Sequence, residues 1–325
     1  MTTSSLTALP DLAPPASWAT RVGVPLLAGA AGMTFVGGSV AASTVLVDAP
    51  LFTIQALRYA VACVLLLGFA RARGVRLVAP RGTDWLWLLG VTAAGLVVFN
   101  IALVHGARHA EPAVLGVAVS CVPLLLAVLG PLLEKRRPSP GVLAAALVVT
   151  CGAGLVQGVG RSDAIGLGWA VVVLACEAGF TLLAVPLLAR HGAIGVSVHT
   201  TWLATAMFAV LGVFREGPAA VTRLHADDVL ACAYLAVGVT AVAFVLWYTS
   251  VVRLGAGRAG LLTGIAPIAA ATAGVALGGP FPRPLVWAGI ATVVAGLSLG
   301  LRARPGPGDA RVDHEVIAGK PDVSP

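Results

Sequence analysis

Ten long apolar stretches, separated by short polar segments, run through this sequence and limit it to a small set of folds. Each is close to the length of about 20 residues that a helix needs to cross the hydrocarbon core of a bilayer. Lipid offers no hydrogen bonds to the backbone, so such spans must be helices, and they lack the alternating polarity of outer-membrane strands. We therefore expect an all-α polytopic membrane protein. The ten predicted transmembrane helices cover residues 23–45, 50–70, 85–104, 112–133, 140–157, 166–189, 194–214, 228–250, 258–278 and 284–301.

Composition supports a lipid environment and excludes a nucleic-acid-binding surface. Hydrophobic residues make up 58% of the chain and charged residues 11%, against about 25% charged in soluble domains. The net charge is +7, but the arginines stand between apolar stretches and form no basic face with interleaved aromatic residues. The five cysteines lie inside apolar stretches without a Cys-x-x-Cys pair, so we expect them to be small core residues.

A repeat divides the chain into two halves. Five pairs of residues recur at a spacing of 144, namely Gly116 and Gly260, Ser120 and Gly264, Pro123 and Pro267, Pro140 and Pro284, and Gly152 and Gly296. The pairing predicts a duplicated unit at residues 21–157 and 166–302, joined by a link at 158–165. The polar ends, residues 1–20 and 303–325, are predicted to be disordered cytoplasmic tails.

The loop charges predict which way the halves face. If the N-terminus is cytoplasmic, the inner segments carry 15 Lys and Arg residues and the outer segments carry 5, as the positive-inside rule requires. Each half has five spans, an odd number, so the second half enters the membrane from the opposite side. The sequence thus predicts two inverted five-helix repeats, a construction that secondary transporters use for alternating access.

Small residues and prolines in the spans have predicted mechanical roles. Small residues four positions apart allow helix backbones to approach closely. Such pairs are Gly116 with Ser120, Gly154 with Gly158, Gly260 with Gly264, and Gly296 with Gly300. Pro123 and Pro267 each remove a backbone hydrogen bond at mid-depth, so we expect them to act as helix hinges.

Glu177 is the most distinctive polar residue inside a predicted span. It stands about ten residues into the span at 166–189, which corresponds to a depth of about 15 Å. A carboxylate at that depth is costly in lipid and should face the bundle interior or a cavity. We expect it to bind substrate or a proton. The alternative is a protonated carboxyl that only bonds between helices.

Arg58 reaches a similar depth, eight residues after Pro50 in the second predicted span. It either pairs with Glu177 or binds an anionic group, or it is a snorkelling or structural cation. Asn100 and Trp202 are further candidates for a cavity wall, although one polar residue in a span more often bonds to a neighbouring helix. The other polar or amphipathic residues inside spans are Gln55, Tyr59 and His199.

Residues at the predicted membrane edges have simpler interpretations. Trp85, Trp247 and Tyr248 fall near inner edges, where amphipathic rings are enriched. Glu134 precedes three basic residues at the end of the fourth span, so a local ion pair is its expected role.

Motifs for catalysis and energy coupling are absent from the sequence. It contains neither a Gly-x-x-x-x-Gly-Lys-Ser/Thr phosphate loop nor a His-Glu-x-x-His metal motif. Gly37-Gly38-Ser39-Val40-Ala41 lacks the closing glycine of a nucleophile elbow. We expect no catalytic residues, no metal, no cofactor and no enzymatic activity.

With these features together, the chain resembles the drug/metabolite transporter superfamily with two EamA-type domains. The resemblance covers nearly all of residues 21–302. It is carried by the ten spans in two inverted halves, Arg58, the Ala-Leu run after Asn100, the Glu134 stop, and the glycines Gly152 and Gly296. One departure concerns Glu134, because the position 144 residues later is Gly278 where such proteins usually have a second glutamate.

The resemblance implies an inner-membrane permease that exports a small metabolite, amino acid or drug-like compound. It also implies a substrate cavity among the third, fourth, eighth and ninth helices, with the first and sixth. A passive facilitator or channel is the alternative. The expected partners are the lipid bilayer, a small-molecule substrate and a candidate coupling proton, with no nucleic acid, in a monomer or homodimer.

Overall fold

The computed structural model describes residues 22–46, 48–279 and 281–303. The two segments predicted to be disordered tails, 1–20 and 303–325, lie outside these ranges except for Ala303. Nine helices of the described part are long and apolar enough to cross a membrane, and a further apolar helix covers Val24–Ser39. The prediction of an all-α polytopic membrane protein is confirmed.

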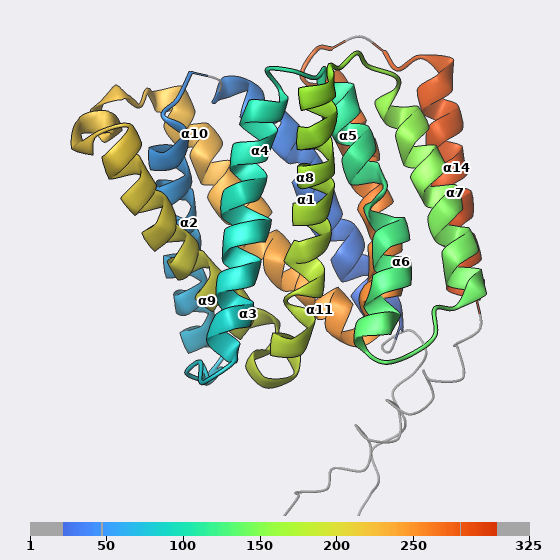
Figure 1. The fold of residues 1–325 in the computed structure, drawn as a ribbon, viewed down its shortest axis with the longest axis horizontal. Coiled ribbons are helices and arrows are strands. Elements are labelled where there is room, and N and C mark those ends of the chain that lie inside the picture. The colour runs from blue at the N-terminus through green and yellow to red at the C-terminus, as the bar shows by residue number, and fades with distance from the viewer. Residues whose placement is uncertain (1–21, 47, 280, 304–325) are drawn as a thin grey trace, which may run out of the picture.

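Five spans are single helices, one is kinked and four are interrupted (Figure 1). The single helices are α1 (Val24–Val45), α2 (Leu51–Ala72), α7 (Pro140–Gln157), α8 (Ala164–Leu182) and α14 (Pro284–Arg302), and the kinked span is α9 (Val185–Arg215). The third span is α3 (Asp84–Gly90), η2 (Val91–Val98) and α4 (Phe99–Gly106), and the fourth is α5 (Pro112–Ser120) and α6 (Val122–Leu133). The eighth is α10 (Ala226–Tyr234), η4 (Leu235–Val242) and α11 (Ala243–Leu254), and the ninth is α12 (Ala256–Leu261), η5 (Leu262–Gly264) and α13 (Ile265–Ala276). A short 3₁₀ helix, η3 (Pro218–Arg223), precedes α10.

The packing of α7 against α14 reveals the relation between the two repeats. A Cβ atom on Gly152 would lie 2.7 Å from the backbone nitrogen of Val293, and one on Gly296 would lie 2.9 Å from that of Val149. Gly152 and Gly296 are 144 residues apart, and so are Val149 and Val293. Each repeat therefore contributes the same surface to the contact. Val149 contacts Gly296 and Gly152 contacts Val293, so later residues of α7 meet earlier residues of α14. The two helices are therefore antiparallel. Such a self-matching contact is what two inverted repeats produce.

This contact leads to a prediction about stability. Gly152→Ala should lower the melting temperature in detergent, because overpacking against backbone atoms that cannot move aside costs about 1–3 kcal/mol. Gly154→Ala is the matched control on the same helix, since a Cβ there meets nothing within 4 Å and alanine favours helix formation over glycine. Thermal unfolding measures both. Equal melting temperatures for the two variants would contradict the packing of α7 on α14.

The other predicted small-residue pairs differ in their surroundings. A Cβ on Gly260 would lie 2.8 Å from the Leu126 Cβ, and the positions of Gly116 and Gly264 are equally close to neighbouring side chains. Gly154 and Gly158, in contrast, have no heavy atom within 4 Å of an added Cβ. That predicted pair therefore makes no close helix contact. Gly158 instead ends α7 with a φ of 80°, a conformation that glycine adopts readily.

The sixth span ends earlier than the sequence predicts. We expected helix as far as residue 189, but α8 stops at Leu182 and the chain turns before α9 begins at Val185. Pro186 then stands at the start of α9, where proline is favoured because it donates no backbone hydrogen bond. A kink follows at Gly192, whose φ is 64°.

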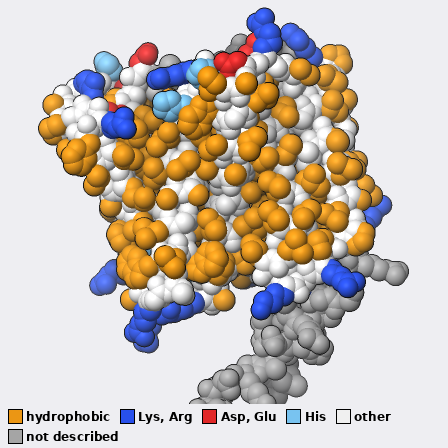
Figure 2. All heavy atoms as spheres, viewed as in Figure 1, with side chains coloured by type: hydrophobic (Ala, Val, Ile, Leu, Met, Phe, Trp, Pro, Cys, Tyr) orange, Lys and Arg blue, Asp and Glu red, His pale blue; other side chains and the backbone are white. Residues whose placement is uncertain are grey.

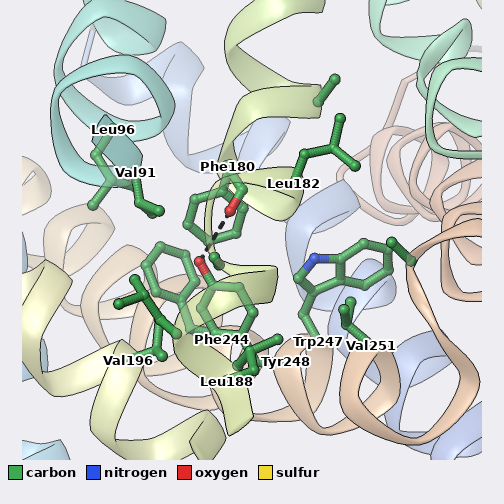
Figure 3. Packing of buried hydrophobic residues seen from close by; sticks show 14 of the residues in the cluster. Val91, Leu96, Phe180, Leu182, Leu188, Val196, Phe244, Trp247, Tyr248 and Val251 are labelled. Carbon is green, nitrogen blue, oxygen red and sulfur yellow. Dashed lines mark hydrogen bonds between the residues drawn. The ribbon is translucent and has the colours of Figure 1, made fainter. Parts of the chain in front are cut away.

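Trp247 and Tyr248 are core residues and not the interfacial belt residues that the sequence predicted. The two side chains are 3% and 0% exposed. The Trp247 indole donates a hydrogen bond to the Thr181 hydroxyl at 2.9 Å, and the Tyr248 hydroxyl donates to the Phe180 carbonyl at 3.2 Å. Figure 3 shows the second bond and the aromatic rings packed around it. Hydropathy places these residues within a span but does not indicate which side of the helix they occupy.

One end of the bundle is more basic than the other, and we call it the basic end. It is the end where α2, α6 and α11 finish and α7 begins, and it carries Arg71, Arg73, Arg136, Arg137 and Arg253. Figure 2 shows Lys and Arg side chains along its rim, at the bottom of the view, below a broad apolar band. At the opposite end, basic, acidic and His side chains are mixed.

Polar contacts at the opposite end join the third and fourth spans to the segment before α8. Arg161 and Glu111 form an ion pair at 3.0 Å, and His109 pairs with Asp163 at the same distance. Asp163 also accepts a hydrogen bond from the Gly166 nitrogen at the start of α8. That bond, followed by the one with His109, lowers the pKa of Asp163 from its ordinary value. The stabilisation is present at neutral pH and is lost as the pH falls through the lowered pKa.

Candidate functional site

Arg58 lies at the centre of a polar network inside the bundle. Its Nε donates a hydrogen bond to the Thr240 hydroxyl at 2.8 Å, and its Nη1 donates to the Gln55 side chain at 3.3 Å. The Gln55 amide in turn donates to Asn100 at 2.8 Å. The guanidinium also lies 5.1 Å from the centre of the Tyr59 ring. The network joins α2 to the third and eighth spans.

Two π-helical segments supply the backbone around this network. η2 covers Val91–Val98 and η4 covers Leu235–Val242, so both boundaries differ by 144 residues. Asn100 donates to the Leu96 carbonyl at 2.7 Å, and the Thr240 hydroxyl donates to the Leu235 carbonyl at 2.9 Å. Long π segments are rare and occur often at functional sites. Their presence at equivalent positions of both repeats marks this level of the bundle as a specialised one.

Glu177 is half-buried on α8 and has no hydrogen bond or ion pair with any described residue. It lies five residues before the end of α8, nearer the basic end than the sequence predicted. Its carboxyl group is within electrostatic range of Tyr59 and Tyr248. A carboxyl group inside a bundle without a protein partner is a candidate for binding a ligand or a proton.

Arg58 and Glu177 are not an ion pair in this structure. The hydrogen bonds of Arg58 go to Thr240 and Gln55, and it has no carboxylate partner among the described residues. Both charged groups nevertheless act electrostatically on Tyr59. A cation and an anion near the same tyrosine, each without an opposite charge from the protein, leave both available to a ligand.

Trp202 belongs to a different cluster. Its ring is 38% exposed and lies 6.1 Å from Trp85, and its indole nitrogen donates to His199 at 3.3 Å. His199 also donates through Nε2 to the Val78 carbonyl at 2.9 Å. The structure therefore brings together Arg58 and Asn100 but places Trp202 near the middle of α9, against Trp85 at the start of α3. Among the described residues there is no cluster of three or more metal-ligating side chains.

Pro123 and Pro267 each stand beside an interruption of their span. The fourth span breaks at Cys121, two residues before Pro123, and the ninth passes through the 3₁₀ segment η5 just before Pro267. Proline removes one backbone donor and clashes with the preceding turn, so the two equivalent breaks have the same cause. Each proline therefore lies next to the interruption of its span.

The fourth and ninth spans meet closely at the basic end only. A Cβ on Gly130 would lie 3.0 Å from the Ala256 Cβ, and Gly130 and Ala256 are both buried. Their equivalents at the opposite end, 144 residues away, are Gly274 and Pro112. Both are exposed, and a Cβ on Gly274 would meet nothing within 4 Å. The two ends of the same pair of spans thus differ in how closely the helices pack.

Sequence reasoning missed Thr240, Gly130 and Ala256. Thr240 lies in an apolar run without a charge beside it, and a hydroxyl there is common in membrane helices. The 144-residue spacing could have paired Gly130 with Gly274, but it gives no sign that the two positions have different surroundings.

Comparisons with known proteins agree with this architecture. Uncharacterized transporter YetK of Bacillus subtilis (strain 168) is 28% identical over 279 residues, which cover 82% of this chain and 84% of that protein. The protein named "Probable terminal-alkyne amino-acid exporter", from Streptantibioticus cattleyicolor, is 27% identical over 250 residues, covering 74% and 81%. One solved crystal structure shares the fold with a TM-score of 0.75 at 21% identity, over 87% of this chain and 98% of that one.

A family model defines the relationship. The model described as the EamA-like transporter family matches this chain twice, at residues 23–157 and 164–302. The two matches cover both halves of the bundle and confirm the resemblance that the sequence suggested. The chain belongs to the EamA-like transporter family of membrane transporters.

Proposed function

We propose that this transporter is a secondary carrier that moves a small metabolite, amino acid or drug-like compound by alternating access. The moving bodies are the two repeats, residues 21–157 and 166–302, which rock against each other around Pro123 and Pro267. The substrate binds between them at the level of Arg58 and Glu177. Export from the cytoplasm is the proposed direction.

The contrast between the two ends of the fourth and ninth spans is the observation that carries the proposal. Gly130 packs on Ala256 at the basic end, while Gly274 and Pro112 are exposed at the opposite end. Inverted repeats can exchange conformations, so the same sequence can adopt a second state with the two ends reversed. In that state Gly274 would pack against Pro112, and the basic end would open.

The polar groups support a ligand that carries charge. Arg58 donates through Nε and one Nη to neutral side chains, which leaves donors for an anionic group of the substrate. Glu177 can bind an amine or a proton. Amino acids carry both kinds of group, and one relative is named as an amino-acid exporter. Asn100 and Gln55 would orient the substrate between these charges.

The charge distribution supports an orientation in the inner membrane. The basic end carries Arg71, Arg73, Arg136, Arg137 and Arg253, and positive loops are retained on the cytoplasmic side. Both termini would then be cytoplasmic, and the end where Gly274 and Pro112 are exposed would face outward.

A passive facilitator is the second candidate function, because loose packing of the fourth and ninth spans at one end also suits a channel. A channel needs a continuous path, however, and the close packing of Gly130 on Ala256 opposes one at the basic end. A carrier and a channel differ in counterflow, which requires a site that reorients while occupied.

Counterflow in proteoliposomes tests the proposal. A panel of amino acids, sugars, nucleosides and lipophilic cations would be assayed with wild-type protein and with Glu177→Gln at two pH values. We expect saturable exchange of one class of compound, lost or made insensitive to pH in the variant. The conservative amide keeps the size of the side chain and removes its charge.

Two outcomes would count against parts of this account. Flux that neither saturates nor shows trans-stimulation would favour the channel. Unchanged exchange in Glu177→Gln would assign a structural role to Glu177 and leave the binding site to Arg58 and Asn100.

A further inference from the structure

The start of α2 is held by a side chain from the other repeat. The first intrahelical bond of α2 runs from the Ile54 nitrogen to the Pro50 carbonyl, so the N–H groups before Ile54 need partners elsewhere. Pro50 stands at the N-cap position, and its side chain cannot form a hydrogen bond. The Glu216 carboxylate, at the end of α9, accepts hydrogen bonds from the Phe52 and Thr53 nitrogens, each at 2.8 Å. The oxygen that binds the Thr53 nitrogen also accepts from the Thr53 hydroxyl at 2.7 Å.

A glycine allows α9 to approach α2 this closely. Gly212 lies one turn before Glu216 and is buried. A Cβ there would lie 3.3 Å from the Thr53 hydroxyl oxygen and 3.5 Å from the Thr53 nitrogen. The Gly212 carbonyl accepts a hydrogen bond from the Glu216 nitrogen at 2.8 Å, so the backbone that carries the carboxylate is fixed to the last turn of α9. Figure 1 shows α2 and α9 side by side.

Glu216 has a different kind of partner from two other glutamates at helix ends. Glu111 pairs with Arg161, and Glu134 forms the predicted local ion pair with Arg136. Glu216 instead binds the first turn of a helix, where the helix dipole favours an anionic group. A helix cap usually comes from an adjacent residue, but this one comes from the other repeat. The contact therefore joins the two repeats at the end opposite to the basic end.

α2 connects this contact to the polar network. It is a single helix over Leu51–Ala72, and Arg58 follows Phe52 by six residues, which is about 9 Å along the axis. The residues between them include neither proline nor glycine, the usual causes of a kink. A displacement of the first turn should therefore move Arg58 as well. Its hydrogen bond to Thr240, at 2.8 Å, leaves little room for such a movement.

The repeat indicates that this contact belongs to one end only. The residues that stand 144 positions from Glu216 and Thr53 are Ala72 and Ser197. Ala72 has no carboxylate, and the Ser197 hydroxyl donates to the Ala193 carbonyl of its own helix at 2.8 Å. The contact thus supports the helix that carries Arg58 and has no equivalent on α9.

We propose that Glu216 is a positioning residue for substrate binding, which holds Arg58 in place between the repeats. The inference rests on the proposed function, because that function assigns the anionic group of the substrate to Arg58. Glu216 acts through α2 and does not touch the substrate. Its loss should therefore resemble a weaker form of the loss of Arg58.

Transport kinetics of the full chain test this role. The probes are the amino acid that the wild-type protein exchanges and the amine that remains when its carboxyl group is removed. Glu216→Gln keeps the size of the side chain, but its amide nitrogen cannot accept from Thr53. We expect the KM for the amino acid to rise by about threefold to tenfold with little change in kcat. The KM for the amine should change less.

A double variant shows whether Glu216 acts through Arg58. A residue that acts only through another has no effect once the other is removed, and a double-mutant cycle measures this dependence. Glu216→Gln should raise the KM in the wild-type background but should add nothing in an Arg58→Met background. Glu111→Gln is the matched control, because it removes a carboxylate from the same end that pairs with Arg161. It should keep the wild-type KM for both probes.

Hydrogen exchange of the α2 backbone gives a second test, which needs no substrate. In Glu216→Gln the amides of Phe52 and Thr53 should exchange faster than in the wild type, and the increase should extend as far as Arg58. Glu111→Gln should exchange at the wild-type rate. A wild-type protein that exchanges no amino acid would count against the proposed substrate, while hydrogen exchange would still decide the role of Glu216.

Three results would overturn the inference. An increase in hydrogen exchange confined to Phe52 and Thr53 would mean that the contact caps α2 without positioning Arg58. An unchanged KM for the amino acid in Glu216→Gln would exclude an effect on binding. Effects of Glu216→Gln and Arg58→Met that multiply in the double variant would show that the two residues act independently.

Discussion

Oxidation of a cysteine pair at Gly130 and Ala256 should stop transport almost completely, and reduction should restore it. The two positions lie on the fourth and ninth spans at the closed basic end, where a Cβ on Gly130 would be 3.0 Å from the Ala256 Cβ. A disulfide usually spans about 3.5–4.5 Å between Cβ atoms, so a small separation of the helices accommodates it. The crosslink would hold the basic end closed and prevent the return to the second state.

The controls use the symmetry of the chain. Pro112→Cys with Gly274→Cys is the equivalent pair at the opposite end, and it should crosslink poorly in the resting protein because nothing lies within 4 Å of an added Cβ at Gly274. Either single cysteine should transport normally in oxidant. Full transport by the crosslinked Gly130 and Ala256 pair would contradict alternating access. The assay needs a background in which the native cysteines are replaced, at Cys63, Cys121, Cys151, Cys176 and Cys232.

Arg58→Met should reduce transport by about tenfold to a hundredfold. Met preserves most of the length of the side chain but donates no hydrogen bond. Hydrogen bonds to a charged group are worth about 1.5–3 kcal/mol, and each 1.4 kcal/mol corresponds to about a factor of ten. The loss should appear as a raised KM for substrates with an anionic group and should be smaller for analogues that lack it.

A purely structural role for Arg58 predicts a different pattern. Its bonds to Thr240 and Gln55 join α2 to the eighth span, so their loss alone would lower the melting temperature and leave KM unchanged in the protein that remains folded. Thr240→Val is the matched control, because it removes one bond of Arg58 and keeps the charge. Equal loss of transport in the two variants, with no dependence on the charge of the substrate, would remove Arg58 from the binding site.

The sequence predicted the spans and the repeat because hydropathy and spacing are local properties. The structure extends this repeat, because the π segments η2 and η4, which the sequence did not predict, are also 144 residues apart. The sequence also identified Arg58, Asn100 and Glu177 as polar residues inside spans, and all three are half-buried in the structure. Depth follows from counting residues along a helix, and that count needs no knowledge of the other helices.

The direction in which each side chain points could not be predicted in the same way. Trp247 and Trp202 are both aromatic and both lie within spans, yet one is 3% exposed and the other 38%. The difference depends on which face of a helix meets its neighbours, and a helix that is apolar all round carries no such signal. For the same reason the partners of Arg58 could not be predicted, and Glu177 was only one of the candidates.

The difference in packing between the two ends of the fourth and ninth spans could not be predicted from the sequence either. Gly130 and Gly274 are equivalent by the repeat, so a prediction from spacing gives them the same surroundings. Under the proposed mechanism, their different burial belongs to one conformation and not to the fold that both conformations would share.

Paired thiol accessibility tests the central claim most directly. Gly130→Cys and Gly274→Cys, in separate chains without other cysteines, would be labelled with a membrane-impermeant maleimide from each side of the membrane, with and without substrate. The account predicts that Gly274→Cys reacts readily from outside and Gly130→Cys slowly from inside, and that substrate lowers the first rate while raising the second. Labelling rates of the two variants that change in the same direction, or that do not change when substrate is added, would contradict alternating access between two states related by the repeat.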